Sequence, residues 1–379
     1  IKNNNNIAAN TTIKYFKKAL ENNGHKVLIF GMDKDFNFMN KNICQVGSNI
    51  IYKPYFKEKW PSTYKIVQSD SKQIKNNLSN IIIENKITLI ITYSTYYPVL
   101  EATIKVARFN KIKCLTYGGE HFAINFKNIL NTINFYQFLA KKFSYKKFDG
   151  HICSTHYHQK TLKKLKIRTI VIPTIAPKLK LNNCENIYSK KRDFKIVWMG
   201  KPNTRELLLR IIKATKLSQM EGCRICLYLI SDIESKKGNH IDKIKKEIKF
   251  SENIFITGFL FNEDKSRLLE SADAFIHLRK FSKETFHAFP TRIPEYLAYN
   301  KPIILSNCTP FSDYFTHLKD CFFINNKNKI LDINKAIKVL YNDHNLCKYI
   351  GSNSDGLVNK HFSFEVNGNK LNNFIKYYE

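Results

Sequence analysis

The sequence predicts an α/β protein with two Rossmann-like, doubly wound domains that face each other across a cleft. Three observations predict this fold: the length of 379 residues, a regular alternation of strand-like and helix-like segments, and a polar break near the middle of the chain. A chain of this length is too long for one ordinary core and suits two domains of about 150–200 residues. Its apolar and charged fractions, 43% and 25%, are those of a folded protein.

Short, continuous apolar runs rich in Ile and Val recur along the chain. Such runs are typical of strands buried on both faces of a parallel sheet. In the first half they are His25–Met32, Thr88–Tyr93, Ile112–Tyr117, Gly150–Ser154 and Thr169–Pro173. In the second half they are Phe194–Met199, Arg224–Ile230, Asn253–Thr257, Ala272–Leu278, Pro302–Ser306 and Cys321–Ile324.

The segments between these runs carry apolar residues at steps of three and four, which indicates amphipathic helices. They include Thr12–Asn23, Glu101–Asn110, Arg205–Ser218 and Ile330–Tyr341. Strands that alternate with helices in this way predict parallel sheets with helices on both faces.

The predicted break is the polar segment Pro177–Arg192, after which a new buried strand begins at once. We therefore expect an N-terminal domain over residues 1–180 and a C-terminal domain over residues 190–360. A last helix, over residues 361–379, is expected to pack back on the N-terminal domain. Because open α/β sheets bind ligands at the carboxyl ends of their strands, the cleft between the domains is the expected site.

The formal net charge is +31, and Lys, Asn and Ile are all abundant, so part of this charge reflects an AT-rich coding sequence. The remaining field attracts nucleotide phosphates, anionic lipid headgroups or nucleic acid. The charge is dense over Lys127–Arg168, where cations alternate with Phe and Tyr and Asp149 is the one acid. This segment suits either a basic amphipathic helix on an anionic membrane surface or a helix that packs its aromatic rings into the core.

Cysteines are scattered, and several lie inside apolar runs, which favours a reducing compartment. Cys223 and Cys226 form a CxxC pair without further ligands nearby, so we expect strand cysteines rather than a zinc site. No apolar run reaches the roughly 20 residues of a membrane span. The first residues carry neither Met nor the apolar core of a signal peptide, so we expect a trimmed N-terminus. These features predict a cytoplasmic protein, with the inner face of the cytoplasmic membrane as one option.

The first candidate site is a loop that ends at Pro290-Thr291 and leads into a short helix and then a strand from Pro302. A helix N-terminus with Thr at its mouth presents free N–H groups and a positive dipole end, which suit a diphosphate. Glu295, one turn into this helix, is placed to accept two hydrogen bonds from a ribose diol. The alternative is an ordinary Thr cap followed by a surface Glu.

The second candidate site follows the strand that ends at Gly200. Lys201, directly after the glycine, and Arg205, on a short loop, are candidates to face a diphosphate. Two cations that neutralise a departing nucleotide diphosphate supply the electrostatic half of catalysis and can take the place of a divalent metal. We therefore expect no cofactor and a metal-independent reaction. The alternative for either residue is a solvated surface charge.

The third candidate site is Tyr117-Gly118-Gly119-Glu120-His121, directly after an apolar run. Two glycines permit close approach of the backbone to a ligand. His121 is then expected at the carboxyl end of the strand, facing the cleft, with Glu120 beside it. The alternative is a structural histidine.

These segments together resemble family 4 glycosyltransferases, also called glycosyl transferases group 1. The pattern Pro-Thr-Arg-x-x-Glu-Tyr-Leu-Ala-x-x-Lys-Pro-Ile-Ile is similar to the donor-binding signature of that family. Lys195–Lys201 resembles its strand that ends in Gly-Arg, and Ser271–His277 resembles its Ala-Asp-x-Phe-Val strand. Leu20–Val27 resembles its Leu-x-x-x-Gly-His-x-Val start. The resemblance covers the second half well and the first half loosely.

The resemblance implies the GT-B fold and a retaining glycosyltransferase that uses a nucleotide-sugar donor, such as a UDP- or GDP-sugar. The implied acceptor is a glycan or a lipid-linked glycan of lipopolysaccharide, capsule or a related surface polysaccharide. Peripheral contact with an anionic membrane would suit such an acceptor, and no nucleic-acid partner is implied. Two alternatives remain: an inactive GT-B-like partner or membrane adaptor, and a basic nucleic-acid-binding protein, which lacks the usual motifs.

The resemblance also implies roles for single residues. Glu295 matches the second glutamate of the Glu-x7-Glu motif, which holds the ribose in the family. The first position of that motif falls on His287, and Glu284 lies three residues further back, so either side chain is a candidate to contact the sugar. Lys201 stands where the family has Arg, and Arg205 is the candidate for its Lys. His121 stands at a position near the anomeric centre of the sugar.

Overall fold

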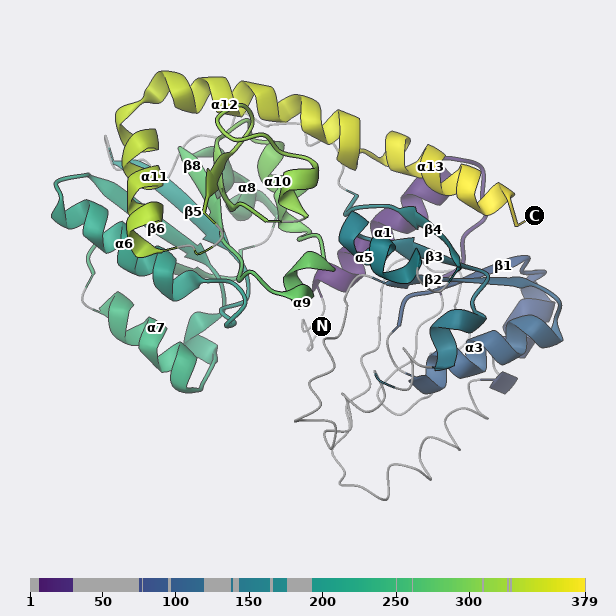
Figure 1. The fold of residues 1–379 in the computed structure, drawn as a ribbon. Helices are drawn as coiled ribbons and strands as arrows, with labels where there is room; N and C mark the ends of the chain where they lie inside the picture. Colours follow the sequence, from purple (N-terminus) through teal and green to yellow (C-terminus); the bar gives the residue numbers. More distant parts are fainter. Residues whose placement is uncertain are drawn as a thin grey trace. The chain divides into compact units, whose positions relative to one another are not determined.

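The computed structural model describes residues 7–29, 75–76, 78–94, 97–118, 138, 143–163, 166–175, 193–249, 251–260, 262–308, 310–325, 327 and 329–378. The chain divides into two compact units. The first comprises Ile1–Ile175, His287–Phe289 and Phe364–Glu379, and the second comprises Ala176–Phe286 and Pro290–Ser363. Each unit is built on a parallel sheet (Figure 1), which confirms the predicted α/β class.

The first unit holds a four-stranded parallel sheet in the order β1-β2-β3-β4. Its strands are β1 (Leu89–Thr92), β2 (Lys113–Gly118), β3 (Gly150–Cys153) and β4 (Arg168–Val171). Its helices are α1 (Ile7–Glu21), α3 (Tyr97–Phe109), α5 (His156–Lys163) and α13 (Phe364–Lys376), with a 3-10 turn η3 at Tyr145–Lys147. All four strands lie within segments that the apolar runs predicted, or differ from them by one residue at an end.

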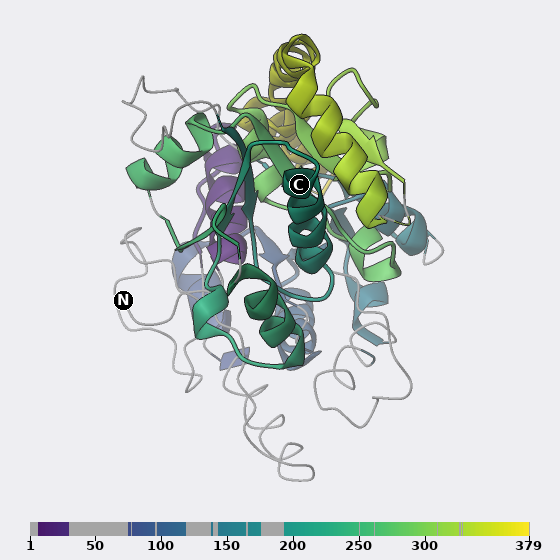
Figure 2. The same ribbon diagram turned by 90° about the vertical axis from the view of Figure 1, so that its left-hand side faces the viewer.

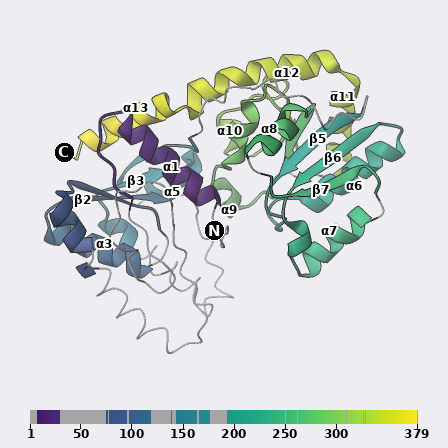
Figure 3. The same ribbon diagram turned by 180° about the vertical axis from the view of Figure 1, so that it is seen from behind.

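The first and last helices of the described residues, α1 and α13, pack together in the first unit. Helix α13 packs along α1, and Figures 1 and 3 both show the two helices side by side. Phe16 and Leu20 of α1 share a buried core with Leu371 and Phe374 of α13 and with Leu115 of β2. Burial of this apolar surface stabilises the unit by roughly 25 cal/mol per Å². The last helix is therefore part of the core of the first unit.

One predicted strand is wrong in the part that the structure describes. The run from His25 to Met32 was expected to form a strand, but residues 25–29 carry no strand ladder, and residues 30–32 lie outside the described residues. Val27 instead packs, partly buried, against the core under α1 and α13. An apolar run predicts burial here, but it does not by itself supply a neighbouring strand.

The second unit holds a six-stranded parallel sheet in the order β10-β9-β8-β5-β6-β7. Its strands are β5 (Phe194–Met199), β6 (Ile225–Ile230), β7 (Ile254–Gly258), β8 (Ala274–His277), β9 (Ile303–Ser306) and β10 (Phe322–Ile324). Counted along the chain, this order is that of a doubly wound dinucleotide-binding sheet, and the order of strands reverses between β5 and β8. Ligands of such sheets bind outside the carboxyl ends of the strands at that reversal.

Helices cover both faces of this sheet. Helices α6 (Leu208–Met220), α7 (Asn239–Lys249) and α11 (Ile330–Asn342) pack on one face, with α6 and α11 side by side in Figures 1 and 2. The remaining helices are α8 (Asn262–Glu270), α9 (Lys283–Phe286), α10 (Arg292–Leu297) and α12 (His344–Leu357), with short turns η4 (Ile233–Ser235), η5 (Phe311–Asp313) and η6 (Val358–Phe362). On the second face, Phe275 of β8 stacks on Tyr296 of α10 with ring centroids 4.3 Å apart. None of the helices in the described ranges is long and apolar enough to cross a membrane.

Candidate functional site

The end of strand β5 is held by helix α10. The N–H of Met199 donates to the hydroxyl of Tyr296 at 2.8 Å, and the carbonyl of Met199 accepts from Nη1 of Arg292. Arg292 and Tyr296 are four residues apart, so their side chains leave the same face of α10. The helix therefore fixes both backbone groups of the last residue of the strand.

Gly200 follows Met199 and is required by the side chains that lie over it. Nη1 of Arg292 also donates to Oε2 of Glu206 at 2.6 Å, which makes a buried ion pair. A Cβ atom on Gly200 would collide with both Arg292 Nη1 and Glu206 Oε2. The glycine at the end of β5 is thus explained by the close approach of an arginine and a glutamate.

The loop after Gly200 is a tight turn. Oδ1 of Asn203 accepts from the backbone N–H groups of Arg205 at 2.9 Å and Glu206 at 3.1 Å. This is the local hydrogen bonding by which Asn stabilises turns. The turn leaves Lys201 and Arg205 exposed, and the N–H of Lys280 donates to the carbonyl of Arg205 at 2.8 Å. The loops after β5 and β8 are therefore joined.

Arg279, two residues beyond β8, is buried, with 7% of its surface exposed. Its N–H donates to Oγ of Ser306 at 2.9 Å, its carbonyl accepts from the same hydroxyl at 3.1 Å, and its Nη1 donates to the carbonyl of Thr285 at 3.5 Å. Burial lowers the pKa of the Arg279 guanidinium to about 10, with Glu206 opposing the shift and the charges of Arg205 and Arg292 adding to it. The side chain stays charged at neutral pH.

We call Arg205, Arg279, Arg292 and Glu206 the arginine cluster. It lies at the carboxyl ends of β5 and β8, where the strand order reverses, and it sets three arginines against one glutamate. Arg279 is buried and the Arg292 side chain is 17% exposed, whereas Arg205 is exposed. Positive charge withdrawn from water, as on Arg279 and Arg292, is costly unless an anion compensates it. This arrangement suits an anionic ligand such as a phosphate group.

His277, the last residue of β8, lies beneath the arginine cluster with no exposed surface. Burial, and then the charges of Arg292 and Arg279, hold the pKa of His277 well below its usual value, so the ring is neutral at pH 7. Neither ring nitrogen has a hydrogen-bond partner among the described residues. The ring packs edge to face on Phe311 at 5.9 Å.

The predicted cap and ribose-binding residues lie at the start of α10. Thr291 occupies the N-cap position, but its side chain makes no capping hydrogen bond, and α10 has only six residues. Pro290 and Glu295 are partly exposed. Oε1 of Glu295 pairs with Nζ of Lys265 at 2.5 Å, and the two side chains are 25% and 29% exposed. The carboxylate thus stays accessible from solvent while it is paired with a lysine.

The two candidates for the sugar-contacting position have different surroundings. Glu284, in α9, is partly exposed, and a hydrogen bond from Ser282 lowers the pKa of its carboxyl, as do the charges of Arg205 and Lys280. His287 is buried and counts with the first unit, where Nε2 lies 3.3 Å from the Thr161 hydroxyl. Glu284 is therefore within electrostatic reach of the arginine cluster, whereas the ring of His287 packs against helix α5.

In the first unit, Gly118 ends β2 and is buried. A Cβ atom there would lie 2.5 Å from Cε1 of His158, which is also buried, so the glycine admits the His158 ring. Gly119, Glu120 and His121 lie outside the described residues. Among the described residues, no group of His, Cys, Asp and Glu could hold a metal ion.

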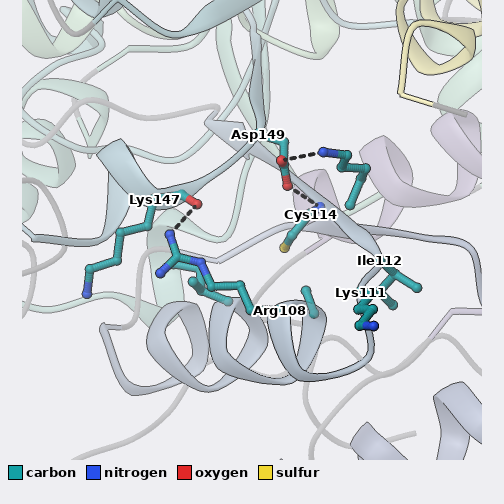
Figure 4. Close-up of a pocket in the computed structure, with 9 residues that line it drawn as sticks. Arg108, Lys111, Ile112, Cys114, Lys147 and Asp149 are labelled. Atoms are coloured by element: carbon teal, nitrogen blue, oxygen red, sulfur yellow. Dashed lines mark hydrogen bonds and ion pairs between the residues drawn. The ribbon is translucent and has the colours of Figure 1, made fainter.

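A second charged feature, which we call the lysine hollow, lies in the first unit at the amino end of strand β2, whereas Gly118 lies at its carboxyl end. It has a volume of about 240 Å³ at the end of α3 and the amino end of β2, and is lined by Ile104, Ala107, Arg108, Lys111, Ile112, Lys113, Cys114, Lys147 and Asp149. Lys113 pairs with Asp149 at 3.4 Å, and Lys147 pairs with Glu101 at 2.8 Å. Figure 4 shows Lys147 and Lys111 on opposite sides of Arg108 and Cys114. Its cations therefore do not converge on one point.

Four residues of the second unit were missed as site residues in the sequence. Arg292 stands inside the Pro-Thr-Arg motif, so its position offered a signal. Glu206 and Arg279 each follow a candidate strand by a few residues, but nothing in the sequence distinguishes them from the many other charges. Lys265 lies on α8, outside the motifs, and only the fold brings it to Glu295.

Comparison with known proteins agrees with this arrangement. Residues 182–356 match the family model described as "Glycosyl transferases group 1". No curated protein sequence matches the chain. Because the solved structures described below are all less than 25% identical to the chain, they show the fold alone.

Sucrose-phosphate synthase from Thermosynechococcus elongatus is 13% identical, with a TM-score of 0.73 over 96% of this chain and 92% of that one. HepE from Anabaena, in complex with UDP-glucose, is 14% identical, with a TM-score of 0.62 over 86% of each chain. The lipopolysaccharide outer core galactosyltransferase WaaB is 13% identical, with a TM-score of 0.64 over 97% of this chain and 94% of that one.

The two parallel-sheet units and the similarity to these structures show the GT-B fold. The enzyme class rests on the family model, whose match makes the protein a glycosyltransferase. Residues 182–356 are its glycosyl transferases group 1 domain, and they contain the arginine cluster and Glu295. The fold, the recognised family and the enzyme class that the sequence predicted are therefore confirmed.

Proposed function

We propose that the protein transfers a sugar, with retention of configuration, from a nucleotide diphosphate donor to a glycan or a lipid-linked glycan. The observation that supports this proposal most is the arginine cluster at the reversal of strand order in the second sheet. A nucleoside diphosphate carries the negative charge that the buried Arg279 and the partly buried Arg292 require. The UDP-glucose bound to HepE, which has the same fold, makes a UDP-sugar the first donor to test.

In this proposal, Lys201 and Arg205 reach the diphosphate from the loop after Gly200, and Glu295 accepts hydrogen bonds from the ribose diol. Donor binding then breaks the 2.5 Å contact between Glu295 and Lys265. Of Glu284 and His287, we propose Glu284 as the residue that contacts the sugar, because it is partly exposed and near the arginine cluster.

The chemical step breaks the bond between the anomeric carbon and the diphosphate oxygen and forms a bond to an acceptor hydroxyl oxygen, while the proton of that hydroxyl passes to the departing diphosphate. The developing negative charge lies on the diphosphate, so cations held around it lower the barrier. Because the arginines and Lys201 supply this charge, we propose that the reaction needs no divalent metal. His121 remains the candidate to line the reacting centre from the first unit, together with Gly118, Gly119 and Glu120.

The acceptor and the membrane contact are proposed on the net charge of +31 and on the similarity in fold to a lipopolysaccharide galactosyltransferase. Most of the basic aromatic segment Lys127–Arg168 before residue 143 lies outside the described residues. In its described part, Phe148 is buried, and burial raises the pKa of Tyr145 to about 12. The rings of Phe148 and Tyr145 therefore pack inward, whereas Phe143, in the same described part, is 43% exposed.

The test is a thermal-shift panel of UDP, GDP, ADP and their sugars, followed by donor hydrolysis and transfer assays with and without EDTA. We expect one nucleotide diphosphate to raise the melting temperature by several degrees, and EDTA to leave turnover unchanged. Stabilisation by none of them, together with tight, salt-sensitive binding of DNA or RNA, would contradict the proposal.

A further inference from the structure

Arg292 combines a fixed position with an unused hydrogen-bonding edge. Both of its hydrogen bonds, to the Met199 carbonyl and to Glu206, come from Nη1. Neither Nε nor Nη2 has a hydrogen bond among the described residues, and the side chain keeps 17% of its exposure. A guanidinium that is held through one nitrogen and has other N–H donors left is suited to bind a phosphate through two parallel hydrogen bonds.

The exposed cations of the same loop differ from Arg292. Lys201 and Arg205 are both exposed, whereas the Arg292 side chain is bonded to the end of β5 and to Glu206. A long exposed side chain loses rotamer entropy when it binds a ligand, and solvent screens its charge. An arginine that is already oriented avoids most of that cost.

Glu206 fixes the orientation of Arg292. The Glu206 side chain is 9% exposed, and its Oε2 lies 2.6 Å from Nη1 of Arg292. The backbone of Glu206 is held in turn, because its N–H donates to Oδ1 of Asn203. Gly200 leaves the space in which the two side chains meet. The pair therefore joins the loop after β5 to helix α10, which also carries Glu295 three residues further on.

We propose that Arg292 is a binding residue for the diphosphate of the donor, and that Glu206 is a positioning residue that acts through Arg292. This inference rests on the proposed function and adds to it residues that the sequence did not single out. It assigns a larger share of diphosphate affinity to Arg292 than to Lys201.

The test compares two ion pairs of the second unit. Arg292→Lys keeps the charge but loses the planar fork, and Glu206→Gln keeps the size but loses the charge. The matched controls are Arg267→Lys and Glu263→Gln, since these residues form a surface pair on α8 at 3.7 Å. Calorimetry measures the Kd of UDP or GDP, whichever binds the wild-type protein, and thermal unfolding without ligand checks the fold.

We expect Arg292→Lys to weaken nucleotide diphosphate binding about 10- to 100-fold and Glu206→Gln about 3- to 10-fold. The double variant should bind no more than twofold more weakly than Arg292→Lys, because Glu206 acts only through Arg292. Both controls should stay within twofold of the wild-type Kd. Binding of the matching nucleoside, followed by saturation-transfer NMR, should be the same in Arg292→Lys as in the wild type.

Wild-type affinity in Arg292→Lys would overturn the proposal, and so would an equal loss of nucleoside binding, which would indicate a structural role only. Additive losses in the double variant would overturn the role of Glu206. If Glu206→Gln does not fold, Glu206→Asp replaces it, and the same coupling with Arg292→Lys is required. A wild-type protein that binds none of the nucleotides would overturn the proposed function and this inference together, so the two failures are distinguishable.

Discussion

The arginine cluster of the second unit and the lysine hollow of the first unit both contain several cations. They differ in how far those cations are withdrawn from water. In the hollow, Lys113 and Lys147 are 51% and 36% exposed, and each is paired with its own carboxylate. In the cluster, Arg279 is 7% exposed and the Arg292 side chain 17%, Arg205 is exposed, and Glu206 pairs with Arg292.

The difference shows why the net charge of +31 does not locate a site. Exposed lysines in water interact weakly with an anion and are screened by salt. Arginines that are withdrawn from water, as Arg279 is and Arg292 is in part, interact more strongly with an anion, because water competes less with the ligand. Burial and convergence, rather than the number of cations, distinguish the candidate site.

The largest effect is expected from Gly200→Ala. The added methyl group would occupy the space of Arg292 Nη1 and Glu206 Oε2, so both flexible side chains must move and their ion pair is lost. We expect nucleotide affinity to fall about 100-fold, which is about 2.7 kcal/mol, with a small change in melting temperature. Gly356→Ala on α12, where a Cβ meets no atom within 4 Å, is the matched control. A nucleotide Kd of Gly200→Ala within threefold of the wild-type value, measured by calorimetry, would mean that the arginine cluster does not bind the nucleotide.

The next effect is expected from Glu295→Gln. A neutral amide holds the ribose diol less well than a carboxylate, so affinity should fall about 30-fold, or about 2 kcal/mol. Unlike Arg292→Lys, this variant should weaken the nucleoside and the nucleotide equally. Glu263→Gln, on the exposed surface of α8, is the control. Unchanged nucleoside binding by NMR would show that Glu295 does not reach the ribose.

A smaller effect concerns pH and the buried histidine under the arginine cluster. The pKa of His277 is well below 6.5 in the folded protein, so below pH 6.5 the unfolded chain binds more protons than the folded one. The free energy of unfolding should therefore fall as pH decreases below 6.5, by up to about 1.4 kcal/mol per pH unit from this group.

His277→Leu removes this group without adding a polar atom. Urea unfolding at pH 5.5 and 7.5 should show a shallower pH dependence in the variant than in the wild type. His151, whose pKa burial lowers to about 4 in the first unit, remains in both proteins and supplies a common background. Equal slopes in the two proteins would mean that His277 is not held neutral by its surroundings.

The smallest effects separate the exposed cations of the two regions. Lys201→Gln should weaken nucleotide binding about fivefold, or about 1 kcal/mol, because an exposed cation contributes little. Lys113→Gln, in the lysine hollow, should leave the Kd within twofold of wild type. Equal losses for the two variants, measured by calorimetry at 50 and 200 mM salt, would mean that the general field and not a local site attracts the nucleotide.

Much of the fold could be predicted because buried parallel strands have a simple pattern. The run Phe194–Met199 is a strand with those bounds, and the run Arg224–Ile230 differs from β6 by one residue. The pattern failed at residues 25–29, because strand pairing depends on a neighbour that an apolar run does not specify. The ends of strands and helices depend on turns such as the one that Asn203 stabilises, and the hydrogen bonds of such turns are seen only in the structure.

The site could be predicted only in part. Gly200 and Glu295 stand in motifs, so their neighbourhood was found, but the contacts of Gly200 with Arg292 of α10 and of Glu295 with Lys265 of α8 join segments that are distant in the sequence. A sequence with 62 Lys and Arg residues gives no way to select those whose side chains converge. Convergence and burial are properties of the fold, and they became visible only in three dimensions.

We expect a nucleotide diphosphate to bind at the carboxyl ends of β5 and β8 in the second unit. Hydrogen–deuterium exchange with and without saturating UDP or GDP tests it most directly. We predict slower exchange in peptides that cover residues 199–206 and 277–297, and unchanged exchange in those that cover residues 104–114. Protection of residues 104–114 instead, or of neither region while the nucleotide is bound, would contradict this account.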